Sequence, residues 1–236
     1  MSINDEIKRR YLRLGWLEIL KQEMLEITKP AAYEQFPAAG SDSEPYHNPR
    51  FAHVAQAEKE ALKLLEAHGG DRDIVLASVW IHDRYKPLFY GPDHGNKAAD
   101  WAVENLEGKG FPGEKVKAVE YAVRNHQGWT TVGLDTLEAQ IVWDADKVAH
   151  LGPSFFVGDI LMFTSKYMCE NVFPFKIKYE PTFSLENILA VLMEWKKDDD
   201  VYEVPPHGYY LEETKKIHVE KSKAVNAFLD ALLKGL

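Results

Sequence analysis

Residues 74–83 read IVLASVWIHD, a nearly apolar run that ends in the adjacent pair His82 and Asp83. Asp71, just before the run, is a favourable N-cap residue. The segment therefore predicts a rigid apolar helix that presents an imidazole and a carboxylate at its end. These two ligand types together suit Zn, Mn, Fe, Ni or Co. The alternative is a plain helix terminus, where a histidine interacts favourably with the helix dipole.

Helical periodicity also dominates the rest of the chain. Apolar residues recur every three to four positions, and we find no convincing run of alternating strand residues. The expected helices are 3–28, 51–67, 71–83, 97–106, 114–126, 136–151, 155–170, 184–197 and 211–233, with a long loop over 31–49 after Pro30 and a polar loop over 198–208. The chain is therefore predicted to be a single all-α domain over residues 1–236, a helical bundle.

Composition excludes several classes of protein. The chain has 28 basic and 37 acidic side chains, a formal net charge of −9, whereas a protein that grips long nucleic acid needs a basic face. The longest nearly apolar stretch is far shorter than the ~20 residues that span a bilayer, and the N-terminus lacks the apolar core of a secretion signal. With Cys169 as the single cysteine, an internal disulfide and a zinc ribbon are excluded. We expect a cytoplasmic protein that binds neither long nucleic acid nor a membrane.

A second acidic element lies inside the expected helix 136–151, which is apolar on most faces and should be buried. Asp144 and Asp146 stand in QIVWDADKVAHLG, residues 140–152. Charges inside such a helix are costly unless they are paired or bound to a metal. Two positions apart, the carboxylates cannot share a helical face, so at most one should bind a given ion directly. The alternative is a buried ion pair with Lys147 or Arg84.

The order His53, then His82-Asp83, then Asp146, on successive helices, resembles the HD-domain superfamily of metal-dependent phosphohydrolases. The local sequences are similar too: YHNPRFAHVAQ resembles the helix of the first histidine, SVWIHD the doublet, TLEAQIVWDADKVAHLG the final acid, and VRNHQG the segment of a further histidine. The resemblance covers about residues 46–152 and points to the small stand-alone hydrolases. It implies a bundle of the HD-domain type with flanking N- and C-terminal helices.

This resemblance assigns the metal ligands to His53, His82, Asp83 and Asp146. Asp144 would then orient a ligand from behind it. His94 and His126 resemble the histidines with which some members bind a second metal or a phosphate, although each could also be a loop or capping histidine. Arg84 and Lys147 would balance the charge of a phosphate. His47 is as readily a loop residue as a substrate contact, and we expect the remaining histidines to be structural or solvated: His68, His150, His207 and His218.

The implied reaction is hydrolysis of a phosphoester or phosphoanhydride of a small phosphorylated substrate, a nucleotide, by water activated on a divalent Mn, Ni, Co, Zn or Fe ion. Asp83 would accept a proton from that water, and His126 or His94 would protonate the leaving group or hold a second metal. Residues 84–88 lack the carboxylate of alarmone hydrolases and some nucleotidases. No GYP signature follows His126, which disfavours a cyclic dinucleotide phosphodiesterase.

Two other functions stay open at this point. Some members with the pattern His, His-Asp, His, His, Asp hold two irons and activate dioxygen, and His94 and His126 complete that pattern here. The chain could also be a non-catalytic nucleotide-binding module.

Overall fold

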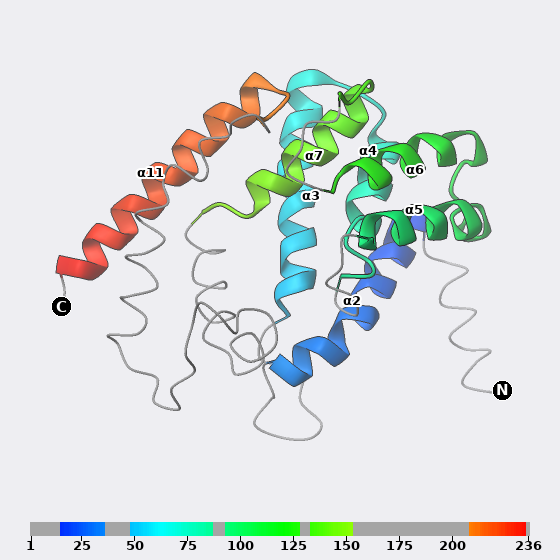
Figure 1. Cartoon of the computed structure of the whole chain (residues 1–236), viewed down its shortest axis with the longest axis horizontal. Helices are drawn as coiled ribbons and strands as arrows, with labels where there is room; N and C mark the ends of the chain where they lie inside the picture. Colours follow the sequence, from blue (N-terminus) through cyan, green and yellow to red (C-terminus); the bar gives the residue numbers. More distant parts are fainter. Residues whose placement is uncertain (1–14, 36–47, 87–92, 128–132, 153–207, 235–236) are drawn as a thin grey trace.

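The computed structural model describes residues 15–35, 48–86, 93–127, 133–152 and 208–234. Within these ranges the chain forms α-helices and short 3-10 turns and no strand, so the all-α prediction is confirmed (Figure 1). The elements are α2 (Trp16–Gln35), α3 (Pro49–His68), α4 (Arg72–Ile81), α5 (His94–Asn105), η1 (Glu107–Lys109), η2 (Gly113–Lys115), α6 (Val116–Asn125), α7 (Leu137–Ala149) and α11 (Glu212–Lys234). The helices expected at 155–170 and 184–197 lie outside the described residues.

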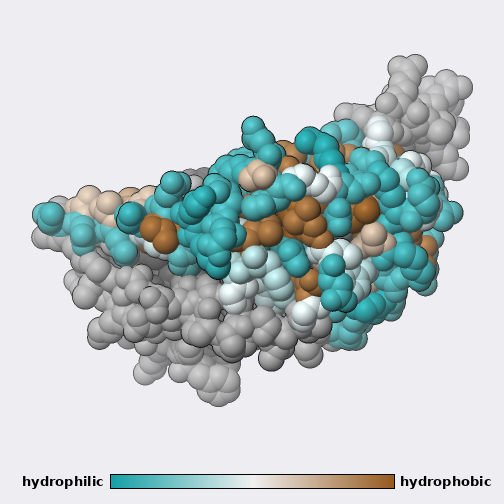
Figure 2. Space-filling model, turned by 90° about the horizontal axis from the view of Figure 1, so that it is seen from above, coloured by the Kyte–Doolittle hydropathy of each residue, from teal (hydrophilic) through white to brown (hydrophobic). Residues whose placement is uncertain are grey.

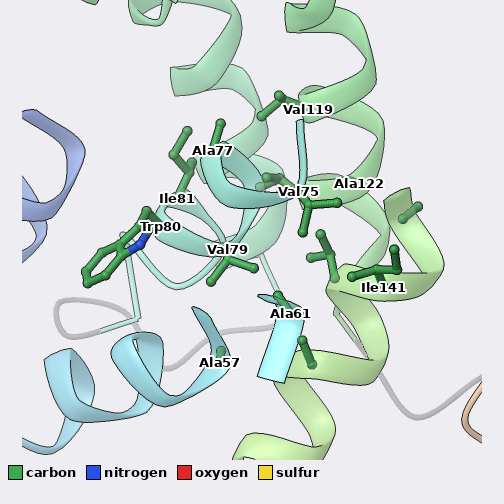
Figure 3. Packing of buried hydrophobic residues seen from close by; sticks show 14 of the residues in the cluster. Ala57, Ala61, Val75, Ala77, Val79, Trp80, Ile81, Val119, Ala122 and Ile141 are labelled. Carbon is green, nitrogen blue, oxygen red and sulfur yellow. The ribbon is translucent and has the colours of Figure 1, made fainter. Parts of the chain in front are cut away.

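Helix α4 lies in the hydrophobic core, together with α7, whose burial the sequence predicted. Every residue from Val75 to Ile81 is buried. Val75 and Val79 share one buried cluster with Ala61 of α3 and Ile141 of α7 (Figure 3). Fully burying a side chain of valine size contributes about 1.5–3 kcal/mol. Because α4 is enclosed on nearly all faces, the residues that follow its last turn emerge inside the bundle.

Local side-chain caps set where the central helices begin. The Asn48 side chain accepts a hydrogen bond from Phe51 N at 3.1 Å, and Pro49 occupies the first turn of α3, so that this helix begins two residues before the predicted start. Asp71 caps α4 by accepting hydrogen bonds from Asp73 N at 3.0 Å and Ile74 N at 3.3 Å, as predicted. These caps fix the register of the helices that carry the candidate site.

Helix α2 differs from the prediction that a loop follows Pro30. The helix continues through Pro30 to Gln35. Its buried residues recur every four positions and form one stripe against the core: Leu20, Met24, Thr28 and Ala32. Pro30 itself faces outward, where the backbone hydrogen bond it cannot donate is lost beside solvent. The buried stripe therefore outweighs the proline as a helix breaker.

Helix α11 packs across α7 and α3 through a buried ion pair. Lys221 Nζ lies 2.8 Å from Glu60 Oε1 and donates a hydrogen bond to Val148 O at 2.9 Å. Glu60 is fully buried and also accepts hydrogen bonds from Gln56 and Lys63. The C-terminal helix is thus tied to the two helices that carry His53 and Asp146.

Hydrophilic side chains cover most of the described surface visible in Figure 2, with smaller hydrophobic areas between them. The apolar faces of the helices are therefore directed mainly inward. Across the described ranges, none of the helices has both the length and the apolar character that crossing a membrane requires.

Candidate metal centre

Five helical elements bring polar side chains to one buried point. His53 lies on α3, His82 and Asp83 follow the last turn of α4, His94 begins α5, His126 follows α6, and Asp146 lies on α7. All six side chains are buried, with exposed fractions between 0% and 8%. The structure thus brings together the four residues predicted as metal ligands and the two additional histidines.

The inner group consists of His53, His82, Asp83 and Asp146. Asp146 Oδ1 lies 3.0 Å from His53 Nε2 and 3.5 Å from His82 Nε2. Asp83 Oδ2 lies 3.8 Å and 3.7 Å from the same two nitrogens. Distances this short between imidazole nitrogens and carboxylate oxygens allow one divalent cation to contact several of them.

The outer group consists of Asp83, His94 and His126. Asp83 Oδ1 lies 3.5 Å from His94 Nε2 and 3.8 Å from His126 Nε2. The two rings meet edge to face with their centroids 5.3 Å apart. Asp83 therefore faces the inner group with one oxygen and the outer group with the other, so its carboxylate could bridge two cations.

Backbone carbonyls determine which nitrogen of two imidazoles faces the centre. His82 Nδ1 lies 2.6 Å from Val79 O, and His126 Nδ1 lies 2.5 Å from Val123 O. A carbonyl oxygen only accepts, so Nδ1 carries the proton and donates it in both histidines. Each Nε2 is then directed into the centre, the arrangement typical of metal-bound histidines.

Three buried atoms at this point fit a cation. Among the described residues, His82 Nε2, His126 Nε2 and Asp83 Oδ1 have no hydrogen-bond partner. Leaving a buried polar atom unsatisfied costs about 1–3 kcal/mol, and such groups are rare in native proteins. Divalent transition metals held by the inner and outer groups would satisfy all three, because imidazole nitrogen and carboxylate oxygen are their usual ligands.

Basic side chains keep both carboxylates ionised. Arg50 donates a hydrogen bond to Asp83 Oδ2, Lys86 Nζ lies 3.3 Å from the same oxygen, and Lys147 Nζ lies 2.7 Å from Asp146 Oδ2. Burial alone would raise the pKa of Asp83, but Lys86 and Arg50 outweigh it and hold this pKa well below its ordinary value. At Asp146, burial likewise acts to raise the pKa, but Lys147 outweighs it and holds this pKa well below its ordinary value.

The histidines differ in protonation. Burial lowers the pKa of His126 to about 4 and holds the pKa of His53 well below its ordinary value, so both rings are neutral and available as ligands at pH 7. At His82 burial also acts to lower the pKa, but the charges of Asp83 and Asp146 outweigh it and the pKa is raised. The environment of His82 thus favours a positive charge between the two carboxylates, which a metal ion would also provide.

The structure does not bring Arg84 to this centre. Its Nη1 donates a hydrogen bond to Glu23 Oε2 at 3.1 Å, and its guanidinium lies 3.7 Å from the centroid of the Trp101 ring. The residue lies in the turn after α4 and its side chain is directed to α2 and α5, so the predicted role in balancing phosphate charge finds no support in this geometry. Lys147, in contrast, lies beside Asp146 as expected.

Asp144 also differs from expectation. Its Oδ1 accepts a hydrogen bond from Tyr210 N at 2.9 Å, and its Oδ2 accepts bonds from Leu211 N at 2.9 Å and Thr214 Oγ1 at 2.8 Å. The carboxylate therefore holds the start of α11 and orients no ligand in the described structure. The two-residue offset from Asp146, which turns it to another face of α7, explains this separation.

Two residues at the centre differ from what the sequence predicted: Arg50 was not singled out, and His150 was expected to be structural or solvated. Arg50 stands three positions before His53 on α3, so the two share a helical face. His150 stands four positions after Asp146, and its ring stacks on His53 with centroids 4.1 Å apart, while its Nε2 lies 3.7 Å from Asp146 Oδ1. Helical spacing from a predicted ligand was the signal in both cases.

The other histidines lie elsewhere. His68 ends α3 at the surface, and His218 on α11 contacts the Tyr209 hydroxyl at 2.9 Å, consistent with structural or solvated roles. His47 and His207 lie outside the described residues.

The fold and this centre together define a helical bundle that gathers histidines and aspartates from separate helices at one buried point. Neither a scan against models of protein families nor a search of curated proteins gives a match. Among solved structures, the chain is similar to a predicted HD superfamily hydrolase from an uncultured Thermotogales bacterium, with a TM-score of 0.56 and 16% identity over 100% of this chain and 99% of that one.

An HD-superfamily hydrolase from Bacillus thuringiensis is similar as well, with a TM-score of 0.50 and 20% identity over 94% of this chain and 98% of that one. At these identities the similarity establishes the fold. The chain has the HD-domain fold, as its motifs predicted.

Proposed function

We propose that this protein is a metal-dependent phosphohydrolase that cleaves a phosphoester or phosphoanhydride of a small substrate. The observation that carries the proposal is the buried set of imidazole nitrogens and carboxylate oxygens whose unsatisfied atoms face one another. His53, His82, Asp83 and Asp146 would hold the ion, which when bound supplies an activated water and polarises a phosphoryl oxygen.

The charges around the centre favour an anionic substrate. Two ionised carboxylates, Asp83 and Asp146, face three basic groups, Arg50, Lys86 and Lys147. The net charge of these five groups is therefore positive before any metal binds, and a divalent ion would make it more positive. A phosphate group would restore the balance, and a guanidinium and ammonium groups are suitable donors to its oxygens. Following the resemblance, we propose a nucleotide as the substrate.

Asp83 is the residue that we propose to take the proton of the attacking water. Its Oδ1 is buried and, among the described residues, accepts no hydrogen bond, while Arg50 and Lys86 are held at Oδ2. His94 and His126 approach the same oxygen. If they hold a second ion together with Asp83, this oxygen is a ligand; otherwise it is free to accept the proton, and one of the two histidines would protonate the leaving group. Lys147, whose Nζ also donates to His126 O at 3.1 Å, connects the two groups.

The direct test is turnover with added metal. Metal-stripped protein given Mn, Co or Ni should hydrolyse p-nitrophenyl phosphate or a member of a panel of nucleoside mono-, di- and triphosphates, dinucleotides and cyclic nucleotides, and a chelator should stop it. Released phosphate or p-nitrophenol is measured. Absence of metal-dependent turnover across the whole panel would rule out the proposal.

A second prediction separates two arginines. Arg50→Met should lower kcat/KM about 10²-fold, since loss of one preorganised donor to developing charge typically costs that much or more. Arg84→Met, the matched control, removes a guanidinium held by Glu23 and Trp101 and should leave kcat/KM within about threefold. Steady-state kinetics decide, and an equal loss in both variants would contradict the charge assignment.

A di-iron oxygenase is the second candidate function. The outer group supplies Asp83, His94 and His126 as ligands for a further ion, which makes a two-metal centre geometrically available. Elemental mass spectrometry of purified protein separates the candidates. Two irons with near-ultraviolet absorption and no phosphate release would favour the oxygenase, whereas Mn, Co, Ni or Zn with phosphate release supports the hydrolase.

A further inference from the structure

We propose that Gly95 and Gln127 are positioning residues of this centre, which together hold His94 and His126 against Asp83 Oδ1 so that the outer group binds a divalent ion of its own. The inference rests on the proposed function, because it takes the centre to be a metal site. It concerns the immediate neighbours of His94 and His126 in the sequence.

The contact joins the start of one helix to the end of another. α5 begins at His94, α6 ends just before His126, and the two helices pack along each other. Gly95 N donates a hydrogen bond to Gln127 Oε1 at 2.9 Å. The first backbone N–H groups of a helix have no partner within the helix, so Gln127 caps α5 from outside it. Each partner is the immediate neighbour of one outer-group histidine.

A side chain at position 95 is limited by the neighbouring side chains and not by backbone conformation. Gly95 is absent from the glycines with positive φ in the described chain. Alanine would favour the helix by about 1 kcal/mol on propensity alone. A Cβ at position 95, however, would lie 2.7 Å from Gln127 Oε1 and 3.1 Å from His126 Cε1. A methyl group would therefore push directly on the capping oxygen and on a candidate ligand ring.

The His126 ring has little freedom to move away from such a methyl group. Its Nδ1 is bonded to Val123 O at 2.5 Å, and its backbone carbonyl accepts from Lys147 Nζ at 3.1 Å. Any displacement changes the 3.8 Å separation between His126 Nε2 and Asp83 Oδ1. His94, which precedes the glycine on α5, would be displaced together with the start of its helix.

The experiment is a cobalt titration of metal-stripped protein, followed by ligand-field absorption and by elemental analysis. Wild type should bind two ions. Gly95→Ala should bind the weaker ion about 10–100-fold less tightly, the usual effect of losing a partner that orients a ligand, and should leave the other ion within about threefold. The matched control is Gly108→Ala, because a Cβ at position 108 meets nothing within 4 Å and should change neither affinity.

Gln127 gives an independent variant without a steric clash. Gln127→Ala should weaken the same ion, and Gln127→Glu, which keeps an acceptor oxygen, should restore most of its affinity. If the two positions act through their contact, Gly95→Ala should have a smaller effect in the Gln127→Ala background than in wild type. Circular dichroism of each variant verifies folding.

Four outcomes would overturn the inference: a single cobalt ion in wild type, unchanged affinities in both Gly95→Ala and Gln127→Ala, equal losses in Gly108→Ala, or failure of Gln127→Glu to exceed Gln127→Ala. Phosphate release is measured separately on the same samples. Wild type that binds two ions with the expected dependence on Gly95 but hydrolyses nothing would contradict the phosphohydrolase and leave the positioning role intact.

Discussion

Asp83→Ala should abolish tight binding of divalent metal and, with it, all metal-dependent turnover. Asp83 is the residue shared by the inner and outer groups, with Oδ2 facing His53 and His82 and Oδ1 facing His94 and His126. Its loss removes a charged ligand from both groups. It also leaves Arg50 and Lys86 close together without the carboxylate that separates their charges.

The stability of this variant should fall for two reasons. Metal that binds only the native state stabilises wild type by about 2.7 kcal/mol at a concentration 100 times Kd, and the variant lacks this contribution. Breaking a buried ion pair by removing one partner typically costs a further 3–5 kcal/mol. Thermal unfolding with and without added cobalt measures both effects.

The control for Asp83→Ala is another aspartate in an ion pair. Asp100 on α5 is 64% exposed at its side chain and lies 2.6 Å from Arg124 Nη2. Surface pairs of this kind contribute about 0–1 kcal/mol, so Asp100→Ala should keep wild-type metal content and unfold within a few degrees of wild type. Full metal content in Asp83→Ala would show that the centre is not a metal site.

The sequence predicted the features that depend on local pattern. The run IVLASVWIHD predicted a rigid apolar helix that ends in His82 and Asp83, and the structure buries α4 in the core with this pair just after its last turn. The resemblance to the HD-domain superfamily, which rests on the order of His53, the doublet and Asp146, implied that these residues meet at one point.

What could not be predicted depends on the direction in which a side chain leaves its helix. Arg50 and Arg84 are both close in sequence to predicted ligands. The Arg84 side chain contacts Glu23 and Trp101, whereas that of Arg50 reaches Asp83. Pro30 stops a helix in isolation, and only the buried Ala32, one turn after the buried Thr28, shows why α2 continues. Packing between helices decides such choices, and one sequence does not show it.

The second large effect is expected on metal content, and it should distinguish the two aspartates of α7. Asp146→Asn should lose most of its bound metal, because the amide has one acceptor oxygen and no charge. Its nitrogen would face either His53 Nε2, 3.0 Å from Oδ1, or Lys147 Nζ, 2.7 Å from Oδ2. Asp144→Asn should retain wild-type metal content, since every hydrogen bond of this carboxylate in the described structure goes to residues 210–214.

Asp144→Asn should instead weaken the attachment of α11. One oxygen cannot replace two, so a backbone N–H of Tyr210 or Leu211 loses its acceptor, at a cost of about 1–3 kcal/mol. Hydrogen exchange of α11 and thermal unfolding measure this loss.

The pH dependence gives a further check on Asp144. Burial raises its pKa to about 6, although the bonds from Tyr210, Thr214 and Leu211 act against this rise. The folded protein therefore binds this proton more tightly than the unfolded chain, and stability from this group is lost as the pH rises through about 6. The difference in free energy of unfolding between wild type and Asp144→Asn should follow that change.

Loss of metal in Asp144→Asn together with its retention in Asp146→Asn would exchange the two roles and contradict the position of the metal centre on α7.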